Sequence, residues 1–192
     1  VPKYPAAMPV TCPVSLRVLT PEAFTEFDYH VMPHLFGSQN DLGRLCDEAI
    51  YEADVIARLE AAGLGPVRSQ VPVVVSHREF RKSYYLDVTV SDCALYELKA
   101  VSAVTGEHRA QMLNYVLLLG LRSSKLVNFR TGRVTSEFVS TSLTAEERRR
   151  VVVDTHRWTL LCERCALLQK TLVELLSDWG AFLEVNLYQE AL

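Results

Sequence analysis

The chain has 192 residues, 49% of them hydrophobic and 22% charged, a composition typical of one globular domain that buries its own core. The five cysteines are odd in number and scattered, so they exclude a disulfide framework and favour a cytoplasmic location; no apolar run approaches the roughly 20 residues of a membrane helix. The net charge of −3 excludes a protein that is basic overall, so any contact with nucleic acid has to come from a local patch.

The first part of the chain predicts an extended arm followed by two helices. Residues 1–19 contain four of the eight prolines and are expected to run over the surface as an arm. Thr20 followed by proline is the pattern of a helix start, and we expect a short helix over residues 21–32 that Pro33 breaks. Residues 41–62 have the apolar spacing of a longer helix.

The middle of the chain predicts three antiparallel strands and a helix. The strands are expected at residues 71–76, 83–90 and 94–100, with a tight turn over residues 91–93 between the last two. Residues 106–121 return to helical spacing, with one apolar face.

The last part predicts two short strands and a helical tail. Strands are expected at residues 125–129 and 134–140. A helix begins near Ala145, where the sequence has the spacing of a capping box, and residues 157–176 are helical again.

This order of elements predicts an α/β fold with a mixed central β-sheet flanked by helices. We expect the arm at residues 1–19, the core at residues 20–143 and a helical C-terminal extension at residues 144–192. The extension carries a wide stripe of leucines. The stripe fits two interpretations, packing on the sheet or a surface for a second copy or a protein partner.

One group of charged side chains falls inside otherwise apolar strands. Asp87 lies in the second predicted strand, while Glu97 and Lys99 lie in the third. Side chains alternate along a strand, so Glu97 and Lys99 share a face, and a tight turn at Asp92 would place Asp87 opposite them. The sequence therefore predicts two carboxylates and an ammonium near one end of a hairpin.

This combination is suited to phosphodiester hydrolysis. Two carboxylates that repel one another can share a divalent cation such as Mg²⁺, which prefers oxygen ligands. A bound metal lowers the pKa of a water and polarises a phosphoryl oxygen, and a lysine can orient that water or offset phosphate charge. The plainer alternative is a solvated strand face with a simple ion pair, but charges inside apolar strands need pairing or a metal.

Five short pieces of the chain, in order, resemble the GxxExxY proteins, a bacterial family within the PD-(D/E)XK nuclease superfamily. The similarity runs from about Asp41 to Leu143 and departs at Leu45, where the glycine that names the motif would fall, with Gly43 nearby but out of register. The matching pieces are Glu48-x-x-Tyr51, Leu86-Asp87, Tyr96-Glu97-Leu98-Lys99-Ala100, His108-x-x-Gln111-x-x-Asn114-Tyr115 and Lys125-Leu126-Val127-Asn128-Phe129.

The resemblance implies a restriction-endonuclease-like core and a set of metal ligands. Asp87 and Glu97 would bind Mg²⁺ or Mn²⁺, with the backbone carbonyl of Leu98 as a further ligand. Glu48 would point from the first long helix towards the same metal. Lys99 would position the attacking water or offset charge.

The resemblance also draws attention to the helix that follows the site. Gln111 and Tyr115 lie one turn apart on one face and would both reach the active-site cleft. The alternative is that these side chains hydrogen-bond the ends of strands.

Two basic groups are local candidates for contact with nucleic acid. Arg78, Arg81 and Lys82 lie between the first two predicted strands, beside the predicted cleft, and Arg130 and Arg133 follow the last core strand. Such groups matter here because the charge of the whole chain does not favour nucleic acid.

Cys162 and Cys165 form a CxxC motif. Zinc would require about four ligands, and only His156 is close in sequence. A redox-active pair would lie at the start of a helix that follows a strand, whereas here the predicted helix begins before the motif. We therefore expect the two cysteines to share a helix face and pack as small hydrophobic side chains.

Two hypotheses for function follow. The first is a Mg²⁺- or Mn²⁺-dependent nuclease that hydrolyses DNA or, as the weaker alternative, RNA. The second is a nucleic-acid-binding or protein-interaction module that keeps a nuclease fold without cutting.

Overall fold

The computed structural model describes residues 9–192 and centres on a six-stranded β-sheet in the order β1-β2-β3-β4-β5-β6. Neighbouring strands are antiparallel except β4 and β5, which are parallel and are connected through α3, so the sheet is mixed. The strands are β1 (Val10–Thr11), β2 (Val67–His77), β3 (Phe80–Val90), β4 (Ala94–Lys99), β5 (Ser123–Asn128) and β6 (Thr135–Ser140). The predicted fold class, a mixed sheet flanked by helices with further helices at the C-terminus, is confirmed.

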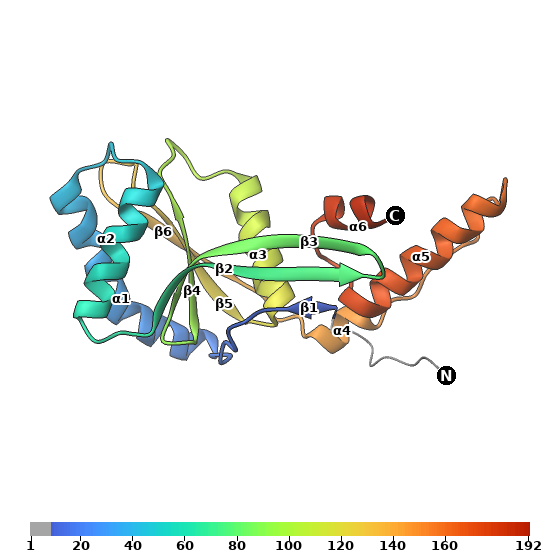
Figure 1. The fold of residues 1–192 in the computed structure, drawn as a ribbon, viewed down its shortest axis with the longest axis horizontal. Coiled ribbons are helices and arrows are strands. Elements are labelled where there is room, and N and C mark those ends of the chain that lie inside the picture. The colour runs from blue at the N-terminus through green and yellow to red at the C-terminus, as the bar shows by residue number, and fades with distance from the viewer. Residues whose placement is uncertain (1–8) are drawn as a thin grey trace.

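Helices cover both faces of this sheet (Figure 1). They are α1 (Pro21–Leu42), α2 (Glu48–Ala61), α3 (Gly106–Leu119), α4 (Ala145–Arg149), α5 (Glu163–Trp179) and α6 (Val185–Ala191). The first hydrophobic core lies between α1, α2 and one face of β4, and the second lies between α3 and the other face. Within residues 9–192, no helix combines the length and the apolar character needed to cross a membrane.

The long β2–β3 hairpin passes from the first core to the second. Val88 packs in the first core, whereas Leu86, two residues away on the same strand, packs in the second. Side chains two apart on a strand point to the same side, so the hairpin has to twist strongly between them. Asp87 lies at this crossing, and opposite it Gln70 has a φ of 50°.

The first helix is longer than the sequence predicted. Pro33 was expected to break it, but α1 continues to Leu42 with Pro33 inside. A proline inside a helix removes one backbone hydrogen bond. The Pro33 ring is exposed to solvent, whereas Met32 and Leu35 beside it are buried in the first core. Tertiary packing of this face therefore holds the helix together across the proline.

The second helix is shorter than predicted, because residues 41–47 divide between the end of α1 and a loop. Gly43 ends α1 with a φ of 76°, a conformation that glycine adopts without steric cost, and α2 begins only at Glu48. Leu45, included in the predicted helix, is 75% exposed in the loop. The tyrosine of the motif, Tyr51, is buried, stacks on Phe129 with ring centroids 4.5 Å apart, and donates a hydrogen bond to the Gly43 carbonyl at 2.6 Å.

The strands agree with the predicted segments apart from their ends, whereas the arm over residues 1–19 stays a prediction. Residues 1–8 of the arm lie outside the described residues, and Val10–Thr11 pairs with β2 as β1. The predicted strand at residues 71–76 extends to Val67–His77, and the one at residues 83–90 begins already at Phe80.

The C-terminal extension packs on the core through its second half. Leu175 and Trp179 of α5 are buried against β2 and α3 in a third hydrophobic cluster, and the Trp179 indole donates to the Ser76 carbonyl at 3.0 Å. The first half of α5 projects from the body (Figure 1) and exposes Leu167 to 57%. Whether these exposed leucines bind a second copy or another protein stays a prediction.

The end of α5 is closely packed against α4, which predicts a sensitive position at Gly180. Its φ of 81° favours glycine, and a Cβ there would lie 2.9 Å from the Arg148 Cβ. We expect Gly180→Ala to lower the free energy of unfolding by about 3 kcal/mol, from conformational strain and overpacking. Gly120→Ala is the control, because Gly120 also has a positive φ but has open space around it, so it should cost only about 1 kcal/mol. Urea denaturation measures both, and equal losses would contradict the steric explanation.

Candidate active site

The β3–β4 hairpin places the predicted pair of carboxylates opposite one another. Val88 pairs with Tyr96, so Asp87 and Glu97 occupy the next position of the antiparallel pair. Lys99 lies two residues beyond Glu97 and therefore on the same face of β4. The tight turn predicted between the strands is present at residues 91–93.

One ammonium group lies among three carboxylates from three different elements. Lys99 Nζ is 2.7 Å from Glu97 Oε1, 3.9 Å from Asp87 Oδ2 and 3.9 Å from Glu48 Oε1 at the start of α2. The Glu97 side chain is 1% exposed, and those of Asp87 and Lys99 are 12% exposed. If all four groups are ionised, the cluster has a net negative charge that a single lysine cannot neutralise.

The protonation of the carboxylates reflects burial and mutual repulsion. Burial, and then the negative charge of Asp87, raises the pKa of Glu97 to about 7, against the opposing effect of Lys99. Burial likewise raises the pKa of Asp87, although the Leu98 N–H donates to its Oδ2 at 2.9 Å. The pKa of Glu48 is raised mainly by burial. Such raised pKa values mark groups that a bound cation would stabilise in their charged form.

The residues present fit a hard divalent cation. Among the described residues, Glu97 Oε2 is buried and has no hydrogen-bond partner, and Asp87 and Glu48 supply further carboxylate oxygens, the ligands that Mg²⁺ and Mn²⁺ prefer. Across residues 9–192, no three His, Cys, Asp or Glu side chains form a ready-made metal cage. Here the Lys99 ammonium lies among the carboxylates, so a metal would have to take its place. The role of the Leu98 carbonyl as a ligand stays a prediction.

Helix α3 brings a polar pair to the same side of the sheet. Gln111 Nε2 donates to the Tyr115 hydroxyl at 2.8 Å. Burial raises the pKa of Tyr115, with the nearby charges of Glu97 and Asp87 adding to the effect, so the phenol lies within electrostatic reach of the carboxylates. The part of this pair in catalysis stays a prediction.

Two other polar residues of α3, Asn114 and His108, have structural roles instead. Asn114 Oδ1 accepts a hydrogen bond from the Glu184 backbone N–H, which ties α3 to the C-terminal extension. His108 accepts from the Thr105 N–H at 3.0 Å and caps the start of α3.

The structure adds two residues that were not predicted as site residues. Gln70 Nε2 donates to Glu52 Oε2 at 2.8 Å, and a hydrogen bond from Gln70 also opposes the rise in the pKa of Asp87. Asn128, 1% exposed, accepts from the Val101 N–H and donates to the Val101 carbonyl, which fixes the chain just beyond the site. Its place in the Lys125–Phe129 piece of the family resemblance was the one signal that could have found it.

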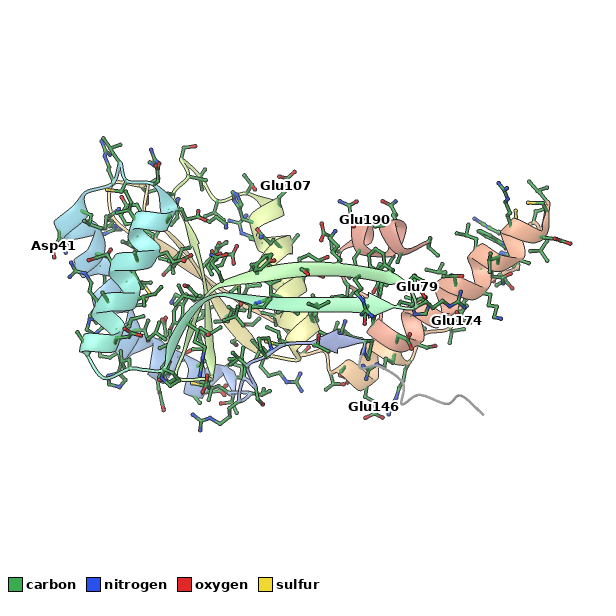
Figure 2. All side chains as sticks on the ribbon, viewed as in Figure 1. Asp41, Glu79, Glu107, Glu146, Glu174 and Glu190 are labelled. Carbon is green, nitrogen blue, oxygen red and sulfur yellow. The ribbon has the colours of Figure 1, made fainter. Side chains whose placement is uncertain are left out.

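The first basic group is not beside the site. Arg78, Arg81 and Lys82 lie at the distal tip of the β2–β3 hairpin, five or more residues along the chain from Asp87. Arg78 contacts Glu174, and Lys82 Nζ is 2.8 Å from Glu190 Oε1. Figure 2 shows this tip, marked by Glu79, far from Asp41 at the other end of the molecule. The expected position beside the cleft was wrong because the strands extend further than predicted.

The second basic group is closer to the site. Arg130 follows β5, and its guanidinium donates to the Cys46 carbonyl at 3.4 Å, just before the start of α2 that carries Glu48. Within residues 9–192 the Arg130 Nε is buried without a hydrogen-bond partner, and Arg133 in the same loop is exposed. Contact of both arginines with nucleic acid stays a prediction.

Comparison of the chain with known proteins identifies its family. Neither a curated protein nor a solved structure matches the chain significantly. The model of a protein family described as "PD-(D/E)XK nuclease superfamily" matches residues 25–140, more than half of the chain. This range contains Glu48, Asp87, Glu97 and Lys99. The chain therefore belongs to the PD-(D/E)XK nuclease superfamily.

Proposed function

We propose that this protein is a metal-dependent nuclease that hydrolyses phosphodiester bonds in DNA, with RNA as the weaker alternative substrate. The observation that carries the proposal is the convergence of Glu48, Asp87 and Glu97 on Lys99, within the residues that match the superfamily. The sequence resemblance to the GxxExxY proteins supports the same assignment of residues.

The proposed roles divide between metal binding and charge compensation. Asp87, Glu97, Glu48 and the Leu98 carbonyl would hold Mg²⁺ or Mn²⁺, which when bound supplies a water of lowered pKa and polarises a phosphoryl oxygen. Lys99, released from the carboxylates, orients the attacking water or offsets the charge of the phosphate.

Further residues would position the substrate. Gln111 and Tyr115 offer an amide and a phenol beside the carboxylates, and they would orient Lys99, water or phosphate through hydrogen bonds. Arg130 and Arg133 would bind a flanking phosphate from the loop after β5. Arg78, Arg81 and Lys82 could contact only a long substrate that extends to the hairpin tip.

A second candidate is a binding module that keeps the fold but does not cut. The observation in its favour is the pairing of Arg78 and Lys82 with acidic residues of the C-terminal extension, which leaves less basic surface for nucleic acid. Titration with Mn²⁺ separates the two candidates. An inert module should show no Mn²⁺ binding that Asp87→Asn removes.

The direct test is a cleavage assay on single- and double-stranded DNA and RNA with Mg²⁺ or Mn²⁺. We expect metal-dependent cutting of DNA that Lys99→Ala lowers by about 100-fold or more, since charge compensation and water activation are both lost. Lys170→Ala is the matched control, because Lys170 is exposed on α5 and should leave cleavage unchanged. Cutting that survives Lys99→Ala, or that persists in a chelator, would contradict the proposal. Circular dichroism verifies that each variant is folded.

A further inference from the structure

Two cysteines face one another at the start of α5. The predicted helix over residues 157–176 was wrong at its beginning, because α5 starts at Glu163 and residues 157–162 have no regular structure. Cys162 is therefore the N-cap, and Cys165 lies in the first turn with its N–H bonded to the Cys162 carbonyl at 3.0 Å. The two Sγ atoms are 3.6 Å apart.

Neither thiol packs in a core, contrary to the sequence expectation. Cys162 is exposed and Cys165 is partly exposed, whereas Cys93 is buried. The first half of α5 projects away from the sheet, so solutes reach this end of the helix freely (Figure 1). The pair is separate from the carboxylate cluster, and its chemistry is independent of the proposed nuclease activity.

The position favours a reactive thiolate. The first N–H groups of a helix lack intrahelical partners and stabilise negative charge, and Cys162 makes no side-chain cap that would occupy them. A backbone hydrogen bond at Leu161, and further bonds from the Cys162 thiol and backbone, lower the pKa of Cys165. A thiolate is the attacking species in disulfide exchange.

A structural zinc site is a poorer account of the same pair. Zinc requires about four ligands. In the part of the chain that the structure describes, no third His, Cys, Asp or Glu joins the two thiols in a group that could hold a metal. His156 contacts Asp154 instead, through its Nδ1 at 2.5 Å from Oδ1.

We propose that Cys162 and Cys165 are a redox-active dithiol that closes reversibly to an intrachain disulfide by exchange with small-molecule disulfides. The Cys165 thiolate attacks one sulfur of R–S–S–R, forms a mixed disulfide and releases a thiolate that takes up a proton. Cys162, after losing its proton, attacks the Cys165 sulfur and releases the second thiol. The protein loses two electrons and two protons, and R–S–S–R becomes two R–SH. In a reducing cytoplasm such a bond is transient and serves as a sensor.

The test titrates the full chain with mixtures of oxidised and reduced glutathione in the presence of a chelator, followed by acid quench, alkylation and mass spectrometry. We expect two of the five thiols to disappear together in a two-electron transition, with a Cys162–Cys165 cross-link in the peptide map. Cys162→Ser should stop at a mixed disulfide on Cys165. In the reduced protein, Cys165 should react with iodoacetamide at least about tenfold faster than Cys93.

Three results would overturn the proposal. One is a wild-type protein that accumulates mixed disulfides without closing the cross-link, another is pairing of Cys162 with a cysteine other than Cys165, and the third is stoichiometric zinc that protects both thiols from alkylation. Cleavage by Cys162→Ser and Cys165→Ser is assayed alongside and should equal that of the wild type, so failure here leaves the proposed nuclease function untouched.

Discussion

Replacing Glu97 with glutamine is expected to abolish metal-dependent cleavage and also to change how the stability of the metal-free protein depends on pH. Glu97 is the most buried carboxylate of the cluster, and one of its oxygens has no hydrogen-bond partner in the part of the chain that the structure describes. The amide of glutamine has the same shape but carries no charge for a cation. Function and metal-free stability should therefore respond differently to this one substitution.

The direction of the pH effect follows from the raised pKa. Glu97 has a pKa of about 7 in the folded protein, against its ordinary value of 4.5. The folded state thus holds this proton more tightly than the unfolded chain does. The contribution of Glu97 to folding is fully present below pH 4.5 and is lost as the pH rises through about 7, where the buried carboxylate becomes charged. The loss is at most about 3 kcal/mol for a shift of this size.

Urea denaturation in a chelator between pH 4.5 and 8 measures this dependence. The free energy of unfolding of the wild type should fall across the range, and that of Glu97→Gln should fall by clearly less. Adding Mn²⁺ at pH 7.5 should restore the stability of the wild type, because a cation bound only to the folded state stabilises it, and should not affect the variant. Glu107→Gln is the control, since Glu107 is exposed on α3. Parallel pH curves for wild type and Glu97→Gln would contradict the assigned environment of Glu97.

Asp28→Ala is expected to produce the largest loss of stability, by about 3–5 kcal/mol, because it leaves a buried ammonium without a partner. Lys125 Nζ is 2.6 Å from Asp28 Oδ2, and the two side chains are each 8% exposed. The Tyr96 hydroxyl donates to the other carboxylate oxygen at 3.2 Å, and Lys125 Nζ lies 3.7 Å from the centre of the Phe138 ring.

Two controls separate the charge from the packing. The double variant Asp28→Leu/Lys125→Met removes both charges and should be close to the wild type in stability. Tyr96→Phe removes only one hydrogen bond and should cost about 1 kcal/mol. Tyr96 and Glu97 point to opposite faces of β4, so the folded double variant should bind Mn²⁺ as the wild type does. A double variant as unstable as Asp28→Ala would show that packing, not an unpaired charge, causes the loss.

The sequence by itself determined the strands of the hairpin, the turn between them and the face that Glu97 shares with Lys99. These features depend on side-chain alternation and turn residues, which act over a few neighbouring positions. The mixed sheet followed from the order of the elements, and the piece from Tyr96 to Ala100 carried the family resemblance.

Only the tertiary structure decided which distant residues join that hairpin. The approach of Glu48 to Lys99 depends on how α2 packs against β4, and the position of Gln70 opposite Asp87 depends on the twist of β2 against β3. The continuation of α1 through Pro33 depends on the burial of its neighbours. The start of α5 at Glu163, with Cys162 as its N-cap, was also decided by the structure, in which residues 157–162 are exposed and have no regular structure.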